Sequence, residues 1–331
     1  MTRMLVLSRA DVESLLDLDA LVEALASAMT DLSSGRASVP PRVAARVDER
    51  EAMLAAMPGF VPSLGALETK LVSLFPQNAG TGRPTHQAVI VAFDPDTGEP
   101  AALMDGTYIT ATRTGAGSAL AARLLARPES RVLAILGSGV QARSHARAVF
   151  RVRPIEEIRI ASRDPANAAK LAEELSGTLG IAVRGAASYA EAMDGADVVC
   201  AATHTVSPVL RRDAVVPGMH LSSVGYNVAG REVEAEVFRD AVVVVESRAA
   251  ALAPLPSGAP DLVAAVADGV FAPDDIHAEI GELVSGARPG RTSPDQITLY
   301  RSVGVAVQDA AAAMLVLEAA RARGVGTKID L

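Results

Sequence analysis

The segment of residues 131–150, RVLAILGSGVQARSHARAVF, constrains the fold of this chain more than any other segment. Its apolar run, Val132–Leu136, is continuous, which is typical of a strand buried on both faces of a sheet. Residues 137–139 are Gly-Ser-Gly, and a segment with helical character follows from residue 142 to residue 150. Glycines between a strand and a helix permit a tight turn and let backbone N–H groups approach a pyrophosphate. This order of elements therefore predicts a dinucleotide-binding unit.

Composition and charge limit the class of protein. The chain has 331 residues, of which 50% are apolar, so it can bury the cores of two domains. A net charge of −8 and an aromatic content of 3% offer neither a basic surface nor a stacking platform, so we exclude nucleic-acid binding. No apolar run approaches the roughly 20 residues of a membrane span, and the first residues lack a signal-peptide core. We therefore expect a cytoplasmic protein.

Residues that bind metals or act as nucleophiles are sparse. Cys200 is the one cysteine and lies in an apolar run, DVVCAA, so we expect a buried thiol rather than a nucleophile. The five histidines show no metal-ligand spacing, and we predict no metal site. His204 alone follows a predicted strand at the sheet edge where ligands bind, and it could face a nicotinamide.

The two halves of the chain have different patterns of elements. After residue 127 short apolar runs alternate with helical segments, which predicts a doubly wound parallel sheet of Rossmann type. The expected strands there are Val132–Leu136, 157–161, 181–184, 197–201, 220–224 and 241–246. The earlier part predicts helices at residues 15–32 and from residue 107, and strands at 68–75, 86–94 and 99–104, the last two forming a hairpin.

Residues 295–323 are interpreted as one long Ala-rich helix. We expect this helix to return to the first part of the chain. The predicted organisation is therefore discontinuous. A Rossmann domain of residues 127–299 is inserted into a second, α+β domain of residues 1–126 and 300–331.

Three cations of the first domain are candidates for chemistry. Lys70 lies within an otherwise apolar strand, Arg113 lies among small residues in TATRTGAG, and Arg42 follows two prolines. Each could be a surface charge with its stem along apolar surface, and for Arg42 alone that interpretation is the better one. The flanks of Lys70 and Arg113 are unusual for solvent-facing residues. Guanidinium groups hold a carboxylate with two bonds, and a buried lysine with a depressed pKa can donate a proton.

The end of the second expected strand bears on the cofactor. Ser162 and Arg163 stand where an acidic residue would bind a ribose hydroxyl, and an arginine beside a hydroxyl suits a 2′-phosphate instead. Asp164 is better explained as the N-cap of the next helix. We therefore predict NADP(H) in preference to NAD(H).

Several ordered blocks resemble the ornithine cyclodeaminase and mu-crystallin family. They include TKLVSLFPQN, the segment PTHQAVIVAFDPDTGEPAALMDGTYITATRTGAGSALAARLLAR, LAILGSGVQARSHA, SRDPANAAKLA, GADVVCAAT, PGMHLSSVG, IHAEIGELVSG and LYRSVGVAVQD. The resemblance covers the chain from about Lys70 to the C-terminal helix. It implies a Rossmann domain with a substrate-binding and dimerisation domain built from both chain ends, and a homodimer. It also implies NAD(P)-dependent chemistry on amino acids or their imines.

The resemblance also assigns roles by motif position. Arg42, Lys70 and Arg113 become the group that binds the substrate carboxylate and performs catalysis. The implied cofactor contacts are Gly137, Ser138, Gly139, Val140, Gln141, Ser162, Arg163, Thr203, Val224 and Gly304.

One departure from the family pattern concerns Asn227, in SSVGYN. Cyclodeaminases and archaeal alanine dehydrogenases of the family carry an aspartate there, and an amide cannot accept a proton as a carboxylate does. We therefore expect reduction of an α-imino acid or the reverse dehydrogenation, with Asn227 near the substrate nitrogen. A plain turn residue is the competing interpretation of Asn227. Ornithine cyclodeaminase activity and a non-catalytic protein that binds NADPH and a small ligand remain the alternative functions.

Overall fold

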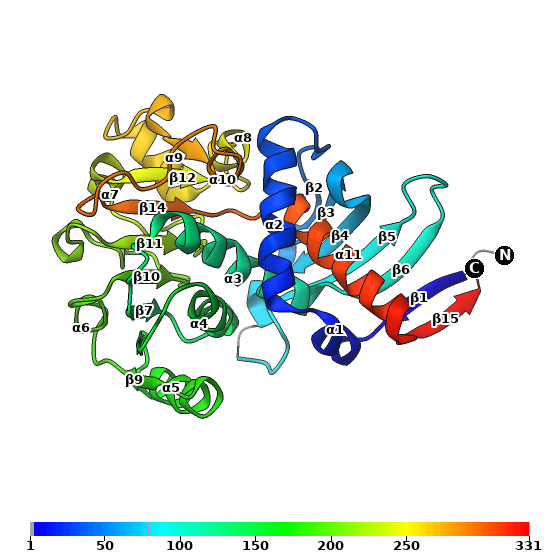
Figure 1. The fold of residues 1–331 in the computed structure, drawn as a ribbon, viewed down its shortest axis with the longest axis horizontal. Coiled ribbons are helices and arrows are strands. Elements are labelled where there is room, and N and C mark those ends of the chain that lie inside the picture. The colour runs from blue at the N-terminus through cyan, green and yellow to red at the C-terminus, as the bar shows by residue number, and fades with distance from the viewer. Residues whose placement is uncertain (1–2, 79, 331) are drawn as a thin grey trace. The chain divides into compact units, whose positions relative to one another are not determined.

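The computed structural model describes residues 3–78 and 80–330, which form two compact units (Figure 1). One unit comprises Met1–Arg113 with Val305–Leu331, and the other comprises Thr114–Gly304. Both ends of the described chain thus belong to the first unit. The exact boundaries expected from the sequence, 1–126 with 300–331 and 127–299, stay a prediction.

The first unit is built on a mixed sheet of seven strands in the order β15-β1-β6-β5-β4-β3-β2. All neighbouring strands are antiparallel except β1 and β6. Its strands are β1 (Arg3–Leu7), β2 (Val43–Val47), β3 (Ala52–Val61), β4 (Ala66–Leu74), β5 (His86–Phe93), β6 (Pro100–Asp105) and β15 (Thr327–Asp330). Its helices are α1 (Arg9–Leu15), α2 (Leu18–Ser33), α11 (Ala306–Arg323) and the first part of α3 (Gly106–Leu125).

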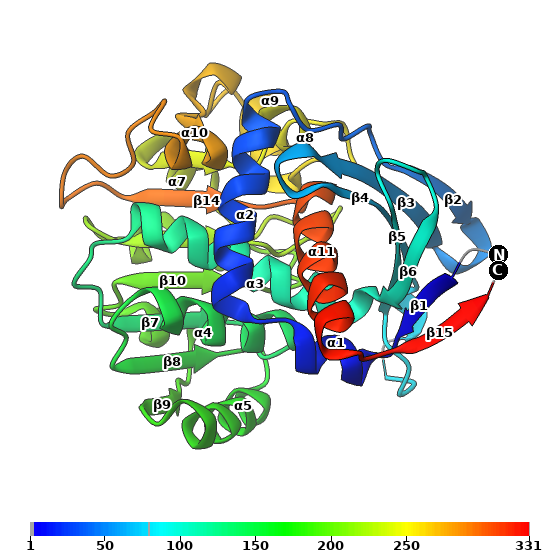
Figure 2. The ribbon, with the colours of Figure 1, turned by 45° about the vertical axis from the view of Figure 1, so that its right-hand side comes forward.

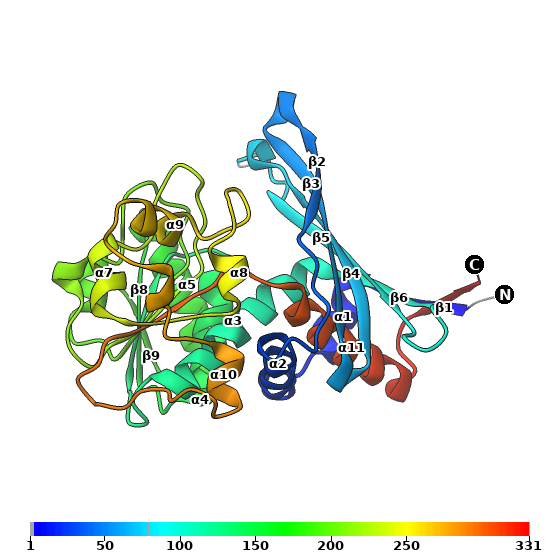
Figure 3. The same ribbon diagram turned by 90° about the horizontal axis from the view of Figure 1, so that it is seen from above.

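Helix α11 packs on one face of this sheet, against β3 and β4, and α2 packs on α11 (Figure 3). Gly59 of β3 permits this close packing, because a Cβ placed on it would lie 3.0 Å from the Ala306 Cβ at the start of α11. The strand β15 follows α11 and pairs antiparallel with β1, so the two ends of the described chain lie side by side (Figure 2). The sequence did not predict β15, which is a short, exposed edge strand.

The second unit is a parallel sheet of eight strands in the order β13-β12-β14-β11-β10-β7-β8-β9. Its strands are β7 (Val132–Leu136), β8 (Glu157–Ala161), β9 (Ala182–Gly185), β10 (Val198–Ala201), β11 (His220–Ser223), β12 (Val242–Val245), β13 (Ala278–Glu279) and β14 (Thr298–Arg301). Its helices after α3 are α4 (Val140–Val152), α5 (Pro165–Leu179), α6 (Tyr189–Met193), α7 (Ala235–Asp240), α8 (Arg248–Ala251), α9 (Pro260–Ala267) and α10 (Ile280–Val284).

Successive residues of the buried strands enter two separate cores. Leu133 and Ile135 of β7 pack with α4, α5 and the end of α3, whereas Ala134 and Leu136 pack with α6, α7 and α9. Helices therefore cover both faces, as a parallel sheet requires. The expected α/β class, a Rossmann sheet together with a second α+β unit, is confirmed. Cys200 is fully buried within this sheet, as expected, and burial raises its pKa to about 12.

The prediction of one helix over residues 295–323 was wrong for the residues before Ala306. Thr298–Arg301 is instead the strand β14, fully enclosed between β11 and β12, and the helix α11 begins only at Ala306. The side chain of Arg301 explains the error. A charged residue argues against a central strand, but here its guanidinium is buried against Asp261, with Nε 2.7 Å from Oδ1. Among the described residues no helix is long and apolar enough to cross a bilayer.

Candidate active site

Lys70 lies on the face of β4 that packs against α11. Alternate residues of β4 are buried, and Lys70 belongs to the buried set with only 2% of its surface exposed. Its Nζ donates a hydrogen bond of 2.7 Å to Oδ2 of Asp309, in the first turn of α11. The expectation that Lys70 is not a surface charge is therefore confirmed.

Arg113 meets the same carboxylate from α3. Its Nε donates to Oδ1 of Asp309 at 3.0 Å, and its Nη1 donates to Oε1 of Gln308 at 2.8 Å. One carboxylate thus holds Lys70 with one oxygen and Arg113 with the other. Two of the three predicted cations are brought together in this way, by an anion that we had not predicted.

The charges of this cluster suit an anionic ligand. Two buried cations face one buried anion, so a net positive charge remains, and a guanidinium has five N–H donors to offer. Burial lowers the pKa of Lys70 to about 8, although Asp309 opposes the shift. Burial disfavours the ionised form of Asp309, but Arg113 and Lys70 together keep its pKa below the usual value. The cluster can therefore bind a carboxylate and donate a proton near neutral pH.

Four further residues of the cluster were missed by sequence reasoning. Asp309 and Gln308 stand in VAVQDAAAA, as the polar pair at the start of an Ala-rich helix, and this was the signal that could have identified them. Glu68 lies two residues before Lys70 and therefore on the same face of β4, and it is buried, with 3% of its surface exposed. His86 begins β5, and its pKa is lowered to about 4 by burial and by the positive charges of Lys70 and Arg113.

Arg42 directly precedes β2 and is half-buried. The first pair of β2 joins Val43 to Ala56, and the next residue of β3, Met57, is the partner of Lys70. Continuing this register, Arg42 lies opposite Met57, and Met57 lies opposite Lys70. Arg42 is therefore in the same cross-strand row as Lys70, with β3 between them. Its contact with a substrate carboxylate stays a prediction.

The glycine turn of the second unit has the geometry expected for a phosphate site. Gly137 has φ +124°, and a Cβ there would lie 2.6 Å from the Ala202 carbonyl oxygen, so only glycine fits. Gly139 is the N-cap of α4 and has open space where a Cβ would project. Ser138, Val140 and Gln141 complete the turn and the first turn of a helix of 13 residues. These features fit a nucleotide pyrophosphate at the helix N-terminus.

At the end of β8, Ser162 and Arg163 lie at the rim of the same sheet edge. Arg163 is exposed, and the Ser162 hydroxyl donates to the Asp164 carbonyl oxygen at 2.5 Å. The Asp164 side chain caps α5 and accepts from the Ala166 N–H at 3.0 Å. The interpretation of Asp164 as a helix cap is confirmed, and Arg163 remains the charged side chain there that can meet a cofactor phosphate.

Buried acids hold the loops that follow β10 and β11. Glu232, which is 4% exposed, accepts from the Thr203 N–H at 2.7 Å and from the Thr203 hydroxyl at 2.6 Å. Its other oxygen accepts from the Ser223 hydroxyl and the Gly225 N–H, both at 2.7 Å. The backbone on either side of Val224 is therefore fixed relative to Thr203.

The residues after β14 are fixed in a similar way. Glu246 accepts from the Val303 N–H at 3.0 Å and from the Gly304 N–H at 3.1 Å. Arg301 donates to the carbonyl oxygens of Ser223 at 3.2 Å and Gly225 at 2.9 Å. Thr203, Val224 and Gly304 thus lie at neighbouring carboxyl ends of parallel strands, which is the edge where nucleotides bind in such sheets. Their contacts with a cofactor stay a prediction.

Asn227 uses its side chain within its own loop. Its Oδ1 accepts from the Ala229 N–H at 3.0 Å, and its carbonyl oxygen accepts from the Gly230 N–H at 3.1 Å. His204 Nδ1 lies 2.6 Å from the Tyr226 carbonyl oxygen, at the same loop. These contacts are those of a turn residue, and a catalytic role for Asn227 stays a prediction.

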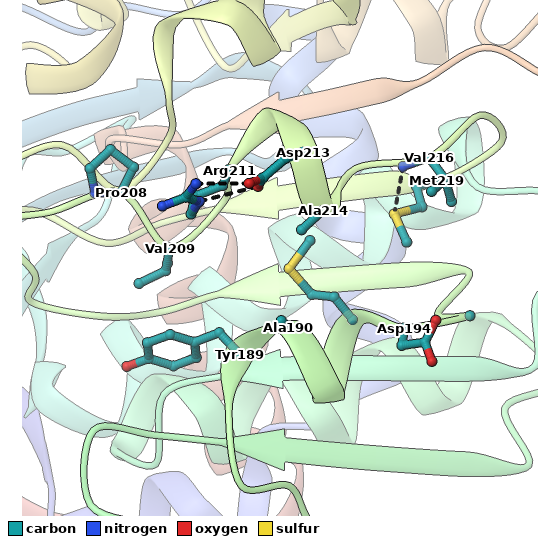
Figure 4. A pocket seen from close by; sticks show the side chains of 12 residues that line it. Tyr189, Ala190, Asp194, Pro208, Val209, Arg211, Asp213, Ala214, Val216 and Met219 are labelled. Carbon is teal, nitrogen blue, oxygen red and sulfur yellow. Dashed lines mark hydrogen bonds and ion pairs between the residues drawn. The ribbon is translucent and has the colours of Figure 1, made fainter.

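A surface hollow of about 570 Å³ lies on the second unit, between α6 and residues 208–219 (Figure 4). None of the predicted site residues lines it. Its arginine, Arg211, is already engaged by Asp213 through two bonds of 3.1 and 2.7 Å. We therefore base no function on this hollow.

Replacing Asp309 by asparagine should destabilise the protein strongly. The change would leave Lys70 and Arg113 buried without their counter-charge, and breaking a buried pair typically costs about 3–5 kcal/mol. The free energy of unfolding in denaturant measures the effect. The exposed Asp96→Asn variant is the control and should unfold like the wild type. Equal stability of the two variants would contradict the bridging role of Asp309.

Comparison with known proteins identifies the family. Residues 2–324 match the ornithine cyclodeaminase/mu-crystallin family. The ketimine reductase mu-crystallin of Mus musculus is 38% identical over 302 residues, 90% of this chain and 91% of that protein. The structure of Thermococcus litoralis Δ1-pyrroline-2-carboxylate reductase with NADH and L-proline is 39% identical with a TM-score of 0.94, covering 98% of this chain and 100% of that one.

A second similar structure is an archaeal alanine dehydrogenase dimer with bound NAD. It is 33% identical with a TM-score of 0.91, and 99% of each chain is covered. The relatives found by sequence and by structure are thus imine reductases and an amino-acid dehydrogenase. The chain therefore belongs to the ornithine cyclodeaminase/mu-crystallin family, and it is an NAD(P)-dependent oxidoreductase of the type that reduces imines or dehydrogenates amino acids.

Proposed function

We propose that the enzyme reduces the C=N bond of a small α-imino acid to an α-amino acid, or catalyses the reverse oxidation. The candidate substrates are a cyclic ketimine, pyrroline-2-carboxylate and iminosuccinate. The observation that carries this proposal is the buried cluster in which Asp309 holds Lys70 and Arg113. Its net positive charge suits the substrate carboxylate, and its lysine has a proton to donate at neutral pH.

The residues divide the work as follows. Arg113 and Arg42 bind the carboxylate, and Lys70 donates a proton to the substrate nitrogen. Asp309 keeps Lys70 and Arg113 in place before the substrate arrives, so little reorganisation is needed during the reaction. A bound nicotinamide cofactor supplies the hydride for the α-carbon.

The cofactor that we propose is NADP(H) in preference to NAD(H). The support is Arg163, whose exposed guanidinium follows β8 at the position where NAD-specific sites carry an acidic residue. Two similar structures contain NADH or NAD. The preference of this chain therefore rests on the side chains of Ser162 and Arg163 alone.

We also propose that the enzyme is a homodimer that forms through the outer face of its mixed sheet. Four apolar side chains of this sheet are each more than a third exposed: Val43, Val47, Leu54 and Val89. The strand register puts all four on the sheet face opposite α11. An exposed apolar face of this kind marks an interaction surface. A similar alanine dehydrogenase is a dimer.

The first experiment follows NADPH and NADH oxidation with a panel of imines. The panel contains pyrroline-2-carboxylate, piperideine-2-carboxylate, and oxaloacetate, pyruvate or glyoxylate mixed with ammonia or methylamine. We expect oxidation with at least one imine, and a rate that falls as the pH rises past about 8, because Lys70 then loses its proton. Ammonia release from ornithine without net cofactor oxidation would indicate a cyclodeaminase, and cofactor binding without any turnover would indicate a binding protein.

The same assay tests Lys70. We expect Lys70→Met to lower kcat by at least about 100-fold, because it removes the proton donor, while the affinity for the cofactor stays within a few-fold. Lys328→Met, which changes an exposed lysine of β15, should behave like the wild type. Normal turnover in Lys70→Met would remove Lys70 from the mechanism.

Cofactor preference should respond to Ser162→Asp. A carboxylate at this position would repel a 2′-phosphate and accept a bond from a 2′-hydroxyl, so the ratio of kcat/KM for NADPH to that for NADH should fall at least tenfold. Ser176→Asp, on the exposed side of α5, is the matched control. An unchanged ratio in Ser162→Asp would show that the end of β8 does not contact the ribose.

The dimer should dissociate when a charge enters the proposed interface. Leu54→Asp puts a carboxylate on the apolar sheet face, so sedimentation should shift from a dimer to a monomer of 34.1 kDa. Val216→Asp changes an exposed valine of the second unit and should leave the dimer intact. A dimeric Leu54→Asp variant would place the interface elsewhere.

A further inference from the structure

A second acid, Glu68, is buried on the same face of β4 as Lys70. It is two residues before Lys70, so their Cα atoms are roughly 7 Å apart along the strand. Only 3% of Glu68 is exposed, and neither carboxyl oxygen has a hydrogen-bond partner among the described residues. Its Oε1 would lie 3.5 Å from a Cβ on Gly59, which itself would touch Ala306, the first residue of α11. The carboxyl group is therefore enclosed by β3, β4 and α11.

This environment favours the neutral form of the acid. An ionised carboxylate without a donor is costly to bury, whereas the protonated acid is much less so. Burial raises the pKa of Glu68 well above the usual value, and the negative charge of Asp309 raises it further, while Lys70 and Arg113 oppose the shift. Burial without a hydrogen-bond donor thus favours the protonated form of Glu68 over the carboxylate.

The other ionisable groups around Glu68 differ in what they can exchange. Asp309 on α11 has a lowered pKa and stays ionised, and Arg113 on α3 stays charged. His86 on β5 has a pKa of about 4 and is neutral. Lys70, with a pKa of about 8, holds a proton that it can release. Within this described cluster, Lys70 and Glu68 are thus the two groups whose protonated forms can exchange a proton.

Imine reduction needs two protons. A neutral imine gains one hydride at carbon and two protons at nitrogen to become an ammonium ion with a single positive charge. Lys70 holds only one transferable proton at a time, so it needs to be recharged before it can supply the second. The number of proton-carrying groups in the cluster matches the number of protons that the reaction consumes.

We propose that Glu68 is the proton reservoir of the site, which restores to Lys70 the proton that Lys70 has given to the substrate nitrogen. This inference rests on the proposed imine reduction. After the first transfer the amine of Lys70 is neutral, so its bond to Asp309 loses its charge assistance and weakens. The amine then takes the proton of Glu68, and the recharged Lys70 delivers the second proton. Two protons have then passed to the substrate nitrogen. Glu68 is left ionised and Lys70 neutral, and each regains one proton from solvent before the next turnover.

The protonation state of Glu68 can be tested without any assay of activity. Above the ordinary pKa of a glutamate, the unfolded chain has released this proton while the folded protein retains it, so wild-type stability falls as pH rises. Glu68→Gln is neutral at every pH and lacks this loss. We expect its folding equilibrium constant, divided by that of the wild type, to rise by up to tenfold per pH unit from about pH 5 upward. Glu99→Gln, an exposed change at the end of the β5–β6 turn, should give a constant ratio. A constant ratio for Glu68→Gln would overturn the proposal.

Rapid-mixing kinetics then test the reservoir, with the panel imine that the wild type reduces fastest. In Glu68→Gln the first turnover of cofactor oxidation should stay within about twofold, because Lys70 still holds its proton. Steady-state turnover should fall about 100-fold and show a larger solvent deuterium isotope effect than the wild type. Unchanged steady-state turnover would overturn the proposal, and so would equal loss of the first turnover. Failure of the proposed function is distinguishable, because the wild type would then reduce no imine while the unfolding experiment still reports on Glu68.

Discussion

The two ion pairs made by Asp309 are the interaction on which the proposed active site depends. One carboxylate joins β4, through Lys70, to α3, through Arg113, and it does so from the first turn of α11. Neither cation could be buried here alone, since an unpaired buried charge is strongly unfavourable. The carboxylate therefore allows a lysine to be enclosed and still protonated, and the enclosure in turn lowers its pKa to about 8. A proton donor for neutral pH follows from this balance.

The cofactor edge of the parallel sheet is built on the same physical principle. Glu232 and Glu246 accept hydrogen bonds from backbone N–H groups of the loops after β10, β11 and β14, and Arg301 donates to their carbonyl groups. The backbone N–H and C=O groups of such loops have few backbone hydrogen-bond partners. Buried charged side chains therefore supply the hydrogen bonds that neighbouring strands supply within a sheet. In both units a small number of buried charges thus holds the segments to which we assign the function.

Sequence reasoning found the features that local chemistry dictates. The glycine turn at residues 137–139, the alternation of strands and helices, and the burial of Lys70 all follow from patterns a few residues long. It failed where a distant partner decides the outcome. β14 was mistaken for part of a helix because the partners that allow Arg301 to be buried are distant in sequence: Asp261 is 40 residues away, and the carbonyl group of Gly225 is 76 residues away. Asp309 was overlooked because its partners, Lys70 and Arg113, precede it by 239 and 196 residues.

The fold class, the glycine turn, the family and two of the central cations could be predicted from the sequence, because each is encoded in short motifs or in their order along the chain. The charge states of those cations and the side chains around them depend on the tertiary structure. It placed Asp309 between them and left Glu68 buried without a donor. The reason is that a pKa depends on burial and on charges in space, and residues from β4, α3 and α11 become neighbours only when the sheet and its covering helices are assembled.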